Sequence, residues 1–209
     1  MEEKRQLIIE RTFDLFHSYG IKSVSMDDIA RELGMSKKTL YQHVKDKSEL
    51  VEAVVDYIRS FSEDAISVFY NKSLNAIQQH HSYWQKMDTK FVNYKPTFHF
   101  DLRKYYPSIM QSINEWKRKT IYEANKTNIE HGIKEGFYRD DLNAHIISRV
   151  LIGYQIYTFD PANGIFSESE ITDSRTFEEV YKYHFFGVCT PKGLEEVRKL
   201  LCSSNKDNH

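Results

Sequence analysis

A short stretch of the sequence gathers side chains that can bind an anion or read the edge of a base. Between Ser36 and Lys47 there are four lysines and one aspartate, a net charge of +3. Lysine binds phosphate as a point charge, and hydroxyl and amide side chains hydrogen-bond the edges of bases. Together with a serine upstream, this stretch supplies the candidate DNA-binding residues. They are Ser25, Lys37, Lys38, Thr39, Tyr41, Gln42, His43 and Lys47.

Two short helices joined by a tight turn are predicted to position these side chains. Ser25 is a suitable N-cap for the first helix, with Asp28 in its first turn. Gly34 is expected to end that helix, because glycine takes the left-handed backbone at low cost. Ser36 then caps a second helix, from Lys37 to about His43. Apolar side chains at helical spacing are expected to face inward, namely Ile29, Leu33, Met35, Leu40 and Val44.

This spacing is that of a helix-turn-helix, whose second helix enters the major groove of DNA while the first braces it against the backbone. An αα-corner inside another helical protein would give the same pattern. On the DNA-binding interpretation, Thr39 and Gln42 are expected to read bases. Ser25, Tyr41 and Lys47 are expected to hold phosphates, which fix the register without reading sequence. The two adjacent lysines at positions 37 and 38 suit either role.

The residues on either side extend the pattern into a resemblance to a known family. The match consists of four runs, from Phe13 to Gly20, from Ser23 to Ala30, from Leu33 to Tyr41 and from Val44 to Leu50. Over about the first fifty residues the chain resembles the N-terminal domain of the tetracycline-repressor (TetR) family. It departs at Lys38, where the family often has a small residue, and at Val44, where an aromatic residue is common. The difference at Lys38 is expected to affect which bases are read.

The overall composition places limits on how the chain can bind DNA. It has 209 residues, 28% of them charged, and a net charge of −1. The first sixty residues contain ten basic and eleven acidic side chains. Binding to double-stranded DNA therefore cannot depend on bulk charge, and we expect it to depend on the local basic patch, doubled by a second subunit.

Several other classes of protein are disfavoured. Cys189 and Cys202 have no paired-motif spacing, the opening residues lack an apolar secretion segment, and no run reaches the about 18 apolar residues of a membrane helix. We therefore expect a cytoplasmic chain that does not enter a membrane. His80, His81 and His99 lack partners at metal-ligand spacing and are expected at the surface or in a pocket. With no catalytic constellation either, we predict no metal, no cofactor and no enzymatic activity.

The rest of the chain is predicted to be helical, which gives an all-α fold. Residues 1–47 are assigned to a three-helix DNA-binding domain and residues 48–209 to a helical effector-binding and dimerisation domain. Breaks are expected at Pro96, at Pro107, at 140–143 and in a loop over 160–174. The predicted helices outside the helix-turn-helix, which bring the total to about ten, cover residues 3–19, 46–70, 73–94, 100–106, 108–135, 143–159, 176–188 and 191–202. The helix over 46–70 is expected to act as a lever between the domains.

Aromatic residues are dense in the middle of the chain, where ten of the 29 lie between Tyr83 and Tyr122. They can simply fill a core. Because buried tyrosine and tryptophan need partners for their polar atoms, such a cluster also suits an apolar cavity for a small molecule. The candidate ligand-binding residues are Trp84, Phe91, Phe98, Tyr105, Trp116 and Tyr122. The expected effector is apolar or aromatic, although nearby Arg103 and Lys104 allow an anionic headgroup.

Two helices near the C-terminus are apolar over broad arcs. Residues 142–159 carry two adjoining apolar stripes, and residues 177–188 are apolar at helical spacing. The resemblance implies that this pair packs against its copy as a four-helix dimer interface. We therefore predict a homodimeric, ligand-responsive repressor that leaves a palindromic, inverted-repeat operator when a small molecule binds. A module that docks on a partner protein, and an enzyme with the aromatic domain as its active site, are the alternatives.

Overall fold

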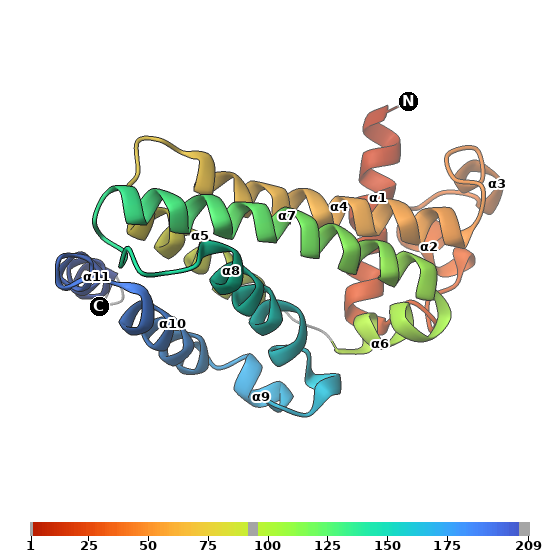
Figure 1. The fold of residues 1–209 in the computed structure, drawn as a ribbon. Helices are drawn as coiled ribbons and strands as arrows, with labels where there is room; N and C mark the ends of the chain where they lie inside the picture. Colours follow the sequence, from red (N-terminus) through yellow and green to blue (C-terminus); the bar gives the residue numbers. More distant parts are fainter. Residues whose placement is uncertain (1, 92–95, 205–209) are drawn as a thin grey trace. The chain divides into compact units, whose positions relative to one another are not determined.

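The computed structural model describes residues 2–91 and 96–204, in which the regular elements are helical apart from one isolated bridge between Tyr138 and Cys189. The helices, shown in Figure 1, are α1 (Glu2–Tyr19), α2 (Met26–Glu32), α3 (Lys37–Leu40), α4 (Lys47–Ser67), η1 (Val68–Tyr70), α5 (Ala76–Phe91), α6 (Pro96–Tyr105), α7 (Pro107–Lys134), α8 (Ala144–Gly153), η2 (Tyr154–Thr158), η3 (Pro161–Asn163), α9 (Glu168–Ile171), α10 (Ser174–Val188) and α11 (Pro191–Ser204). The all-α prediction is confirmed. No helix in the described ranges combines the length and hydropathy needed to cross a bilayer.

The described residues form two compact units. The first contains residues up to 63 together with 96–113, and the second contains 64–91 and 114–204. The first unit thus includes most of α4, whose side chains at positions 50, 51, 54 and 55 join its core. The division of function at residue 47 remains a prediction.

The first unit is built around an apolar core that holds α1, α2, α3, α4 and α6 together. Its buried members include Phe16 from α1, Ile29 from α2, Leu40 from α3 and Leu50 from α4, each with no exposed surface. Of the side chains predicted to face inward, those at positions 29, 40 and 44 are buried and those at 33 and 35 are half-buried. The core therefore fixes both helices of the predicted helix-turn-helix.

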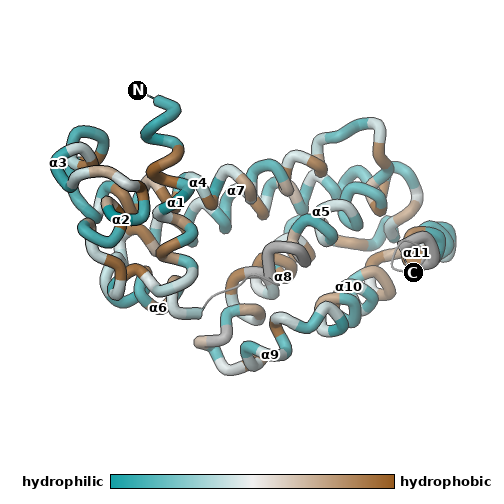
Figure 2. Tube along the Cα trace, turned by 180° about the vertical axis from the view of Figure 1, so that it is seen from behind, coloured by the Kyte–Doolittle hydropathy of each residue, from teal (hydrophilic) through white to brown (hydrophobic). Residues whose placement is uncertain are grey.

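The second unit combines apolar packing with buried hydrogen bonds. The Asn128 amide of α7 donates to the Ala76 carbonyl over 2.7 Å, and the Tyr138 hydroxyl donates to Asn128 Oδ1 over 3.2 Å. Brown and teal segments alternate along α4 and α7 in Figure 2, as expected for helices with one buried face. These contacts hold α5 and α7 together.

Several predicted helix limits differ from the structure. The helix predicted for 100–106 begins earlier, at Pro96, a position where proline loses no helical hydrogen bond. The helix predicted for 143–159 is α-helical to Gly153 and continues as the π-helical turn η2. The loop predicted for 160–174 contains η3 and α9, and Ser167 and Glu170 form a capping box at the start of α9. The predicted helix over 46–70 is α4 followed by η1.

Helix α6 is fitted against the bend between α1 and α2. The Asp101 carboxylate accepts a hydrogen bond from the Lys22 backbone N–H over 2.8 Å. Gly20, at the end of α1, has a φ of 82°, and a Cβ there would lie 2.9 Å from Thr97 Cγ2 and 3.0 Å from Asp101 Oδ2. Glycine is therefore required at this bend for backbone conformation and for space.

We predict that Gly20→Ala destabilises the protein more than Gly34→Ala does. Gly34 also has a positive φ, 61°, but a Cβ there would meet nothing within 4 Å. The left-handed backbone should cost each variant about 1–2 kcal/mol, and the collision with α6 should add about 1–3 kcal/mol at Gly20. Equal losses in urea-unfolding free energy would contradict the close packing of α6 against the bend.

Candidate nucleic-acid interface

The second helix of the helix-turn-helix is a single turn that is capped at its start and held by a buried side chain. The Thr39 N–H donates to Ser36 Oγ over 3.1 Å, which caps α3 at its start. Helix α3 ends at Leu40, earlier than predicted, but the chain keeps turning because the Val44 N–H donates to the Leu40 carbonyl over 3.2 Å. Since Leu40 is fully buried, the polar side chains around it point away from the core.

The candidate lysines differ in the contacts that their ammonium groups already make within the protein. The Lys37 ammonium lies 2.9 Å from an Asp27 carboxylate oxygen, and this hydrogen bond raises the pKa of Lys37. Lys38 is exposed, and no ion-pair partner is found for it in residues 2–91 and 96–204. Lys47 donates to the Ile21 carbonyl over 2.6 Å, and burial lowers its pKa. Lys38 is therefore the best placed to present an unneutralised charge to DNA.

The predicted phosphate anchor Ser25 is occupied as a helix cap. Its side chain accepts from the Asp28 N–H over 3.2 Å, and its own N–H donates to the Asp28 carboxylate over 2.9 Å. The Ser25 hydroxyl also donates to the Asp28 carboxylate over 2.6 Å, and this bond, together with the one from the Ser25 N–H, lowers the pKa of Asp28, whose carboxylate also pairs with Arg31. Ser25 is exposed nonetheless, so its cap role and a phosphate contact are compatible.

The remaining candidates lie around the same turn. Gln42 is exposed, Thr39 and His43 are half-buried, and Tyr41 is 44% exposed. The Thr39 hydroxyl lies 2.9 Å from Ser36 Oγ, so this predicted base reader also takes part in the cap. The structure thus brings the α3 candidates together, while their roles towards DNA remain predictions.

The comparison with known protein families agrees with this geometry. Residues 8–54 match the sequence profile of bacterial regulatory proteins of the tetR family. This chain carries a TetR-family DNA-binding domain. HTH-type transcriptional regulators of Staphylococcus aureus are 46% identical to it over 54 residues, which cover 26% of this chain and 29% of theirs. The match thus spans less than a third of these relatives.

Solved structures resemble the chain over a much greater length. A transcriptional regulator from Cytophaga hutchinsonii has a TM-score of 0.67 and 25% identity, covering 90% of this chain and 99% of its own. SmeT, the repressor of the Stenotrophomonas maltophilia multidrug efflux pump SmeDEF, has a TM-score of 0.63 and 16% identity, covering 90% and 91%. The second likeness shows the fold alone. The helical region after the TetR-family domain therefore also matches regulator structures.

The structure does not bring the six predicted ligand-binding residues into one unit. Phe98 belongs to the core of the first unit, where it is 3% exposed, and Tyr105 lies on the surface of the same unit. The reason is that α6 packs against α1. Trp84, Trp116 and Tyr122 lie in the second unit, and the Phe91 side chain falls outside the described residues.

Within the second unit, Trp84 belongs to a buried aromatic group. Its ring centroid lies 5.7 Å from that of Tyr181 and 6.0 Å from that of Phe177 on α10. Trp116 is half-buried beside this region, whereas the Tyr122 hydroxyl lies 2.6 Å from His145 Nδ1. Of the predicted set, Trp84 and Trp116 thus remain candidates for lining a ligand site.

Sequence reasoning missed two buried polar side chains in the second unit. His80, expected at the surface or in a pocket, is 1% exposed; it accepts from Trp84 Nε1 over 2.9 Å, while its Nδ1 has no partner in the described residues. Its ring lies 5.0 Å from that of His184, and burial lowers the pKa of both, that of His184 to about 4. Both amide atoms of Asn125 are also buried without a partner in those residues. The four-residue spacing of His80 and Trp84 was the available signal.

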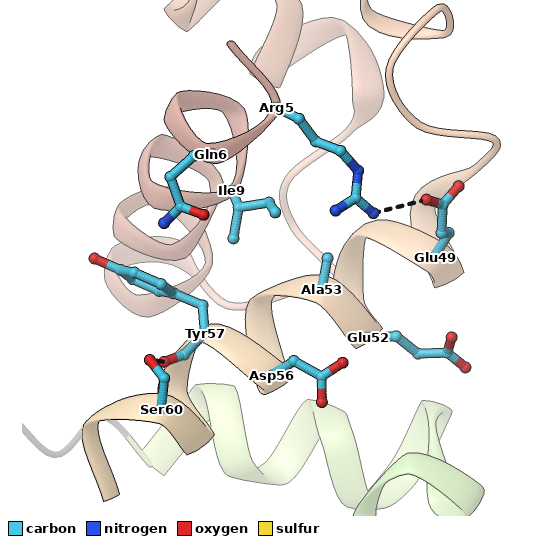
Figure 3. Close-up of a pocket in the computed structure, with 9 residues that line it drawn as sticks. All are labelled: Arg5, Gln6, Ile9, Glu49, Glu52, Ala53, Asp56, Tyr57 and Ser60. Atoms are coloured by element: carbon cyan, nitrogen blue, oxygen red, sulfur yellow. Dashed lines mark hydrogen bonds and ion pairs between the residues drawn. The ribbon is translucent and has the colours of Figure 1, made fainter. Parts of the chain in front are cut away.

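A polar hollow between α1 and α4 was also not predicted (Figure 3). It has a volume of about 450 Å³, and its lining includes Arg5, Glu49, Glu52, Asp56 and Tyr57. Arg5 pairs with Glu49 over 3.0 Å. With three carboxylates and one guanidinium, this hollow does not suit the apolar effector expected from the sequence.

We predict that Gln42→Ala and Lys47→Ala affect DNA binding differently. Loss of a base-reading amide should relax the preference at particular bases and cost about 1–3 kcal/mol on the matched site. Loss of the Lys47 charge should weaken binding to all sequences alike and reduce the salt slope by about one unit. Equilibrium binding to matched and mismatched duplexes at several salt concentrations measures both effects.

Because Lys47→Ala also removes the hydrogen bond to Ile21, urea unfolding must accompany this comparison. Lys72→Ala, an exposed change of equal charge in the second unit, provides the control. Identical behaviour of the two DNA variants on matched and mismatched sites would refute the division into base readers and phosphate anchors.

Proposed function

We propose that the protein is a homodimeric, ligand-responsive transcriptional repressor that binds an inverted-repeat operator. The observation that carries this proposal is the α3 turn, whose polar and basic side chains face outward while buried Leu40 fixes it to a TetR-family domain. Such an arrangement suits insertion into a major groove, with phosphates held at its margins. SmeT, which shares the fold, is described as a repressor, and the same sign of regulation is proposed here.

Exposed apolar side chains support the homodimer. On α8 and the following turn, Ile146, Val150 and Tyr157 are 55%, 45% and 58% exposed. On α10, Tyr183 and Phe186 are 72% and 62% exposed. The other side of each helix packs into the core of the second unit, so each helix has one buried and one uncovered apolar face. Such uncovered apolar faces mark interaction surfaces, and a second copy would cover both helices.

The buried polar atoms of the second unit support a response to a small molecule. A buried donor or acceptor without a partner costs about 1–3 kcal/mol, so a bound molecule that pairs with His80 Nδ1 or the Asn125 amide would be favoured. The surrounding rings of Trp84 and Tyr181 favour an apolar or aromatic compound with one hydrogen-bonding group. Regulation requires that this compound bind the DNA-free and DNA-bound states with different affinity.

Selection of bound fragments from random DNA tests the proposed function. We expect an inverted repeat with half-site centres about 34–36 Å apart, or somewhat more, because two recognition turns are related by a two-fold axis. Hydrophobic and aromatic compounds that raise the melting temperature are then added to the complex, and about 5- to 150-fold weaker binding is expected with an effector. Failure to enrich any sequence would refute sequence-specific DNA binding. Stabilising compounds that never change DNA affinity would refute the switch.

We predict that Phe186→Asp converts the dimer to a monomer. A charge on the exposed apolar face of α10 would be buried without a partner in the dimer, which is strongly unfavourable. Sedimentation at micromolar concentration should change from about twice 24.8 kDa to about 24.8 kDa.

Tyr70→Asp is the matched control, because Tyr70 is 54% exposed in the same unit but lies on η1. A wild-type chain that sediments as a monomer, or a Phe186→Asp variant that stays dimeric, would show that α10 does not form the interface.

A further inference from the structure

The first unit carries a basic and aromatic patch that the helix-turn-helix does not use. The Lys22 ammonium lies 5.0 Å from the centre of the Tyr105 ring, and the Lys104 ammonium lies 5.3 Å from the same centre. Lys104 also lies 5.3 Å from the centre of the Phe100 ring, which is 57% exposed. Two ammonium groups from the α1–α2 bend and from α6 thus converge on one exposed tyrosine.

The local charge balance leaves these ammonium groups without an exposed carboxylate from α6. Asp101 is the single acidic residue of that helix, and its side chain is buried and turned to the backbone N–H of Lys22. Hydrogen bonding to Lys22 lowers the pKa of the Tyr105 phenol, which reflects the positive field at this point. Two ammonium groups held close together repel each other, and an anion that binds between or beside them lowers this repulsion.

The patch belongs to the same compact unit as the predicted DNA-binding surface. Lys22 is exposed and lies three residues before Ser25, the N-cap of α2, on the segment that joins α1 to α2. Helix α6 belongs to the same compact unit as α2 and α3 and contacts α1 directly. Figure 1 shows α6 beside the end of α1 within this unit.

We propose that Lys22 and Lys104, whose ammonium groups both lie against the Tyr105 ring, form a second phosphate-binding surface. This surface contacts the DNA backbone beside the groove occupied by α3. The proposal rests on the proposed function, because it assumes that the first unit docks on duplex DNA. The surface adds affinity without reading sequence, since phosphate contacts position a protein but do not distinguish bases. An acidic protein partner would meet the same charges, but the shared unit with the helix-turn-helix favours DNA.

Salt dependence measured on duplexes of two lengths tests this surface. The double variant Lys22→Ala with Lys104→Ala keeps the Lys22 backbone N–H that bonds Asp101. The probes are the selected duplex trimmed to its two half-sites and the same duplex extended by about one helical turn, roughly 10 base pairs, at each end. Each lost phosphate contact lowers the slope of log affinity against log salt by about 0.9, so a dimer losing one contact per patch should lose about two units on the extended duplex.

Arg118→Ala with Lys119→Ala is the matched control, because it removes two exposed charges of the same sign from α7 in the second unit. The proposal predicts that the control keeps the wild-type slope and that the base preferences of the Lys22 and Lys104 variant are unchanged. If the Lys22 and Lys104 variant changed the slope of log affinity against log salt no more than the control does, on both duplex lengths, the phosphate-binding surface would be overturned. The proposed function would remain intact.

A direct probe of Tyr105 does not depend on the operator. With 3-fluorotyrosine placed at position 105, its ¹⁹F signal should shift when a duplex of random sequence is added at low salt, and the shift should be lost in the Lys22 and Lys104 variant. An unchanged ¹⁹F signal at saturating duplex would overturn the proposal. If random-DNA selection enriches nothing while this signal still shifts, the specific regulator fails and the phosphate surface stands.

Discussion

The burial of Leu40 is the contact on which the functional surface depends. Helix α3 has only four residues, and a helix of that length has no stability of its own in water. Its conformation is imposed by the Ser36 cap at one end and by the apolar core beneath Leu40. The direction of Lys38 and Gln42 is therefore a property of the whole first unit. A change deep in that core should disturb DNA contacts even though it touches no nucleotide.

Helix α6 extends this dependence to a segment far along the chain. The Asp101 carboxylate and Thr97 of α6 enclose the bend at Gly20, and Lys47 of α4 holds the Ile21 carbonyl. The bend between α1 and α2 is thus held by two elements that follow it in sequence. Because Lys47 is the first residue of α4, the same residue joins the bend to that helix.

The sequence was sufficient to predict the elements that depend on local signals. The N-caps at Ser25 and Ser36, the glycine after α2 and the apolar spacing through Leu40 were enough to identify the helix-turn-helix, although the conformation of α3 also depends on the core beneath Leu40. On α8, Ile146 and Val150 of one predicted apolar stripe are exposed and Leu151 of the adjoining stripe is buried.

What the sequence did not predict depends on contacts between distant residues. Phe98 was grouped with Trp84 by its position among aromatic residues, yet it packs in the first unit because α6 docks on α1. His80 was expected at the surface or in a pocket, but α10 covers it with Phe185 and His184. The pairing of Lys47 with a backbone carbonyl 26 residues away leaves no periodic trace in the sequence.

The ion pair between Lys37 and Asp27 affects how DNA-binding measurements on this protein should be read. An exposed pair of this kind is worth about 0–1 kcal/mol, so a phosphate can readily replace the carboxylate. In that exchange Lys37 gives up a fixed anion rather than a mobile counterion, and Asp27 must attract a cation from solution. The release of ions from DNA is then partly cancelled by uptake at the protein. The number of phosphate contacts deduced from an ionic-strength titration would therefore be smaller than the number of lysines that touch the backbone.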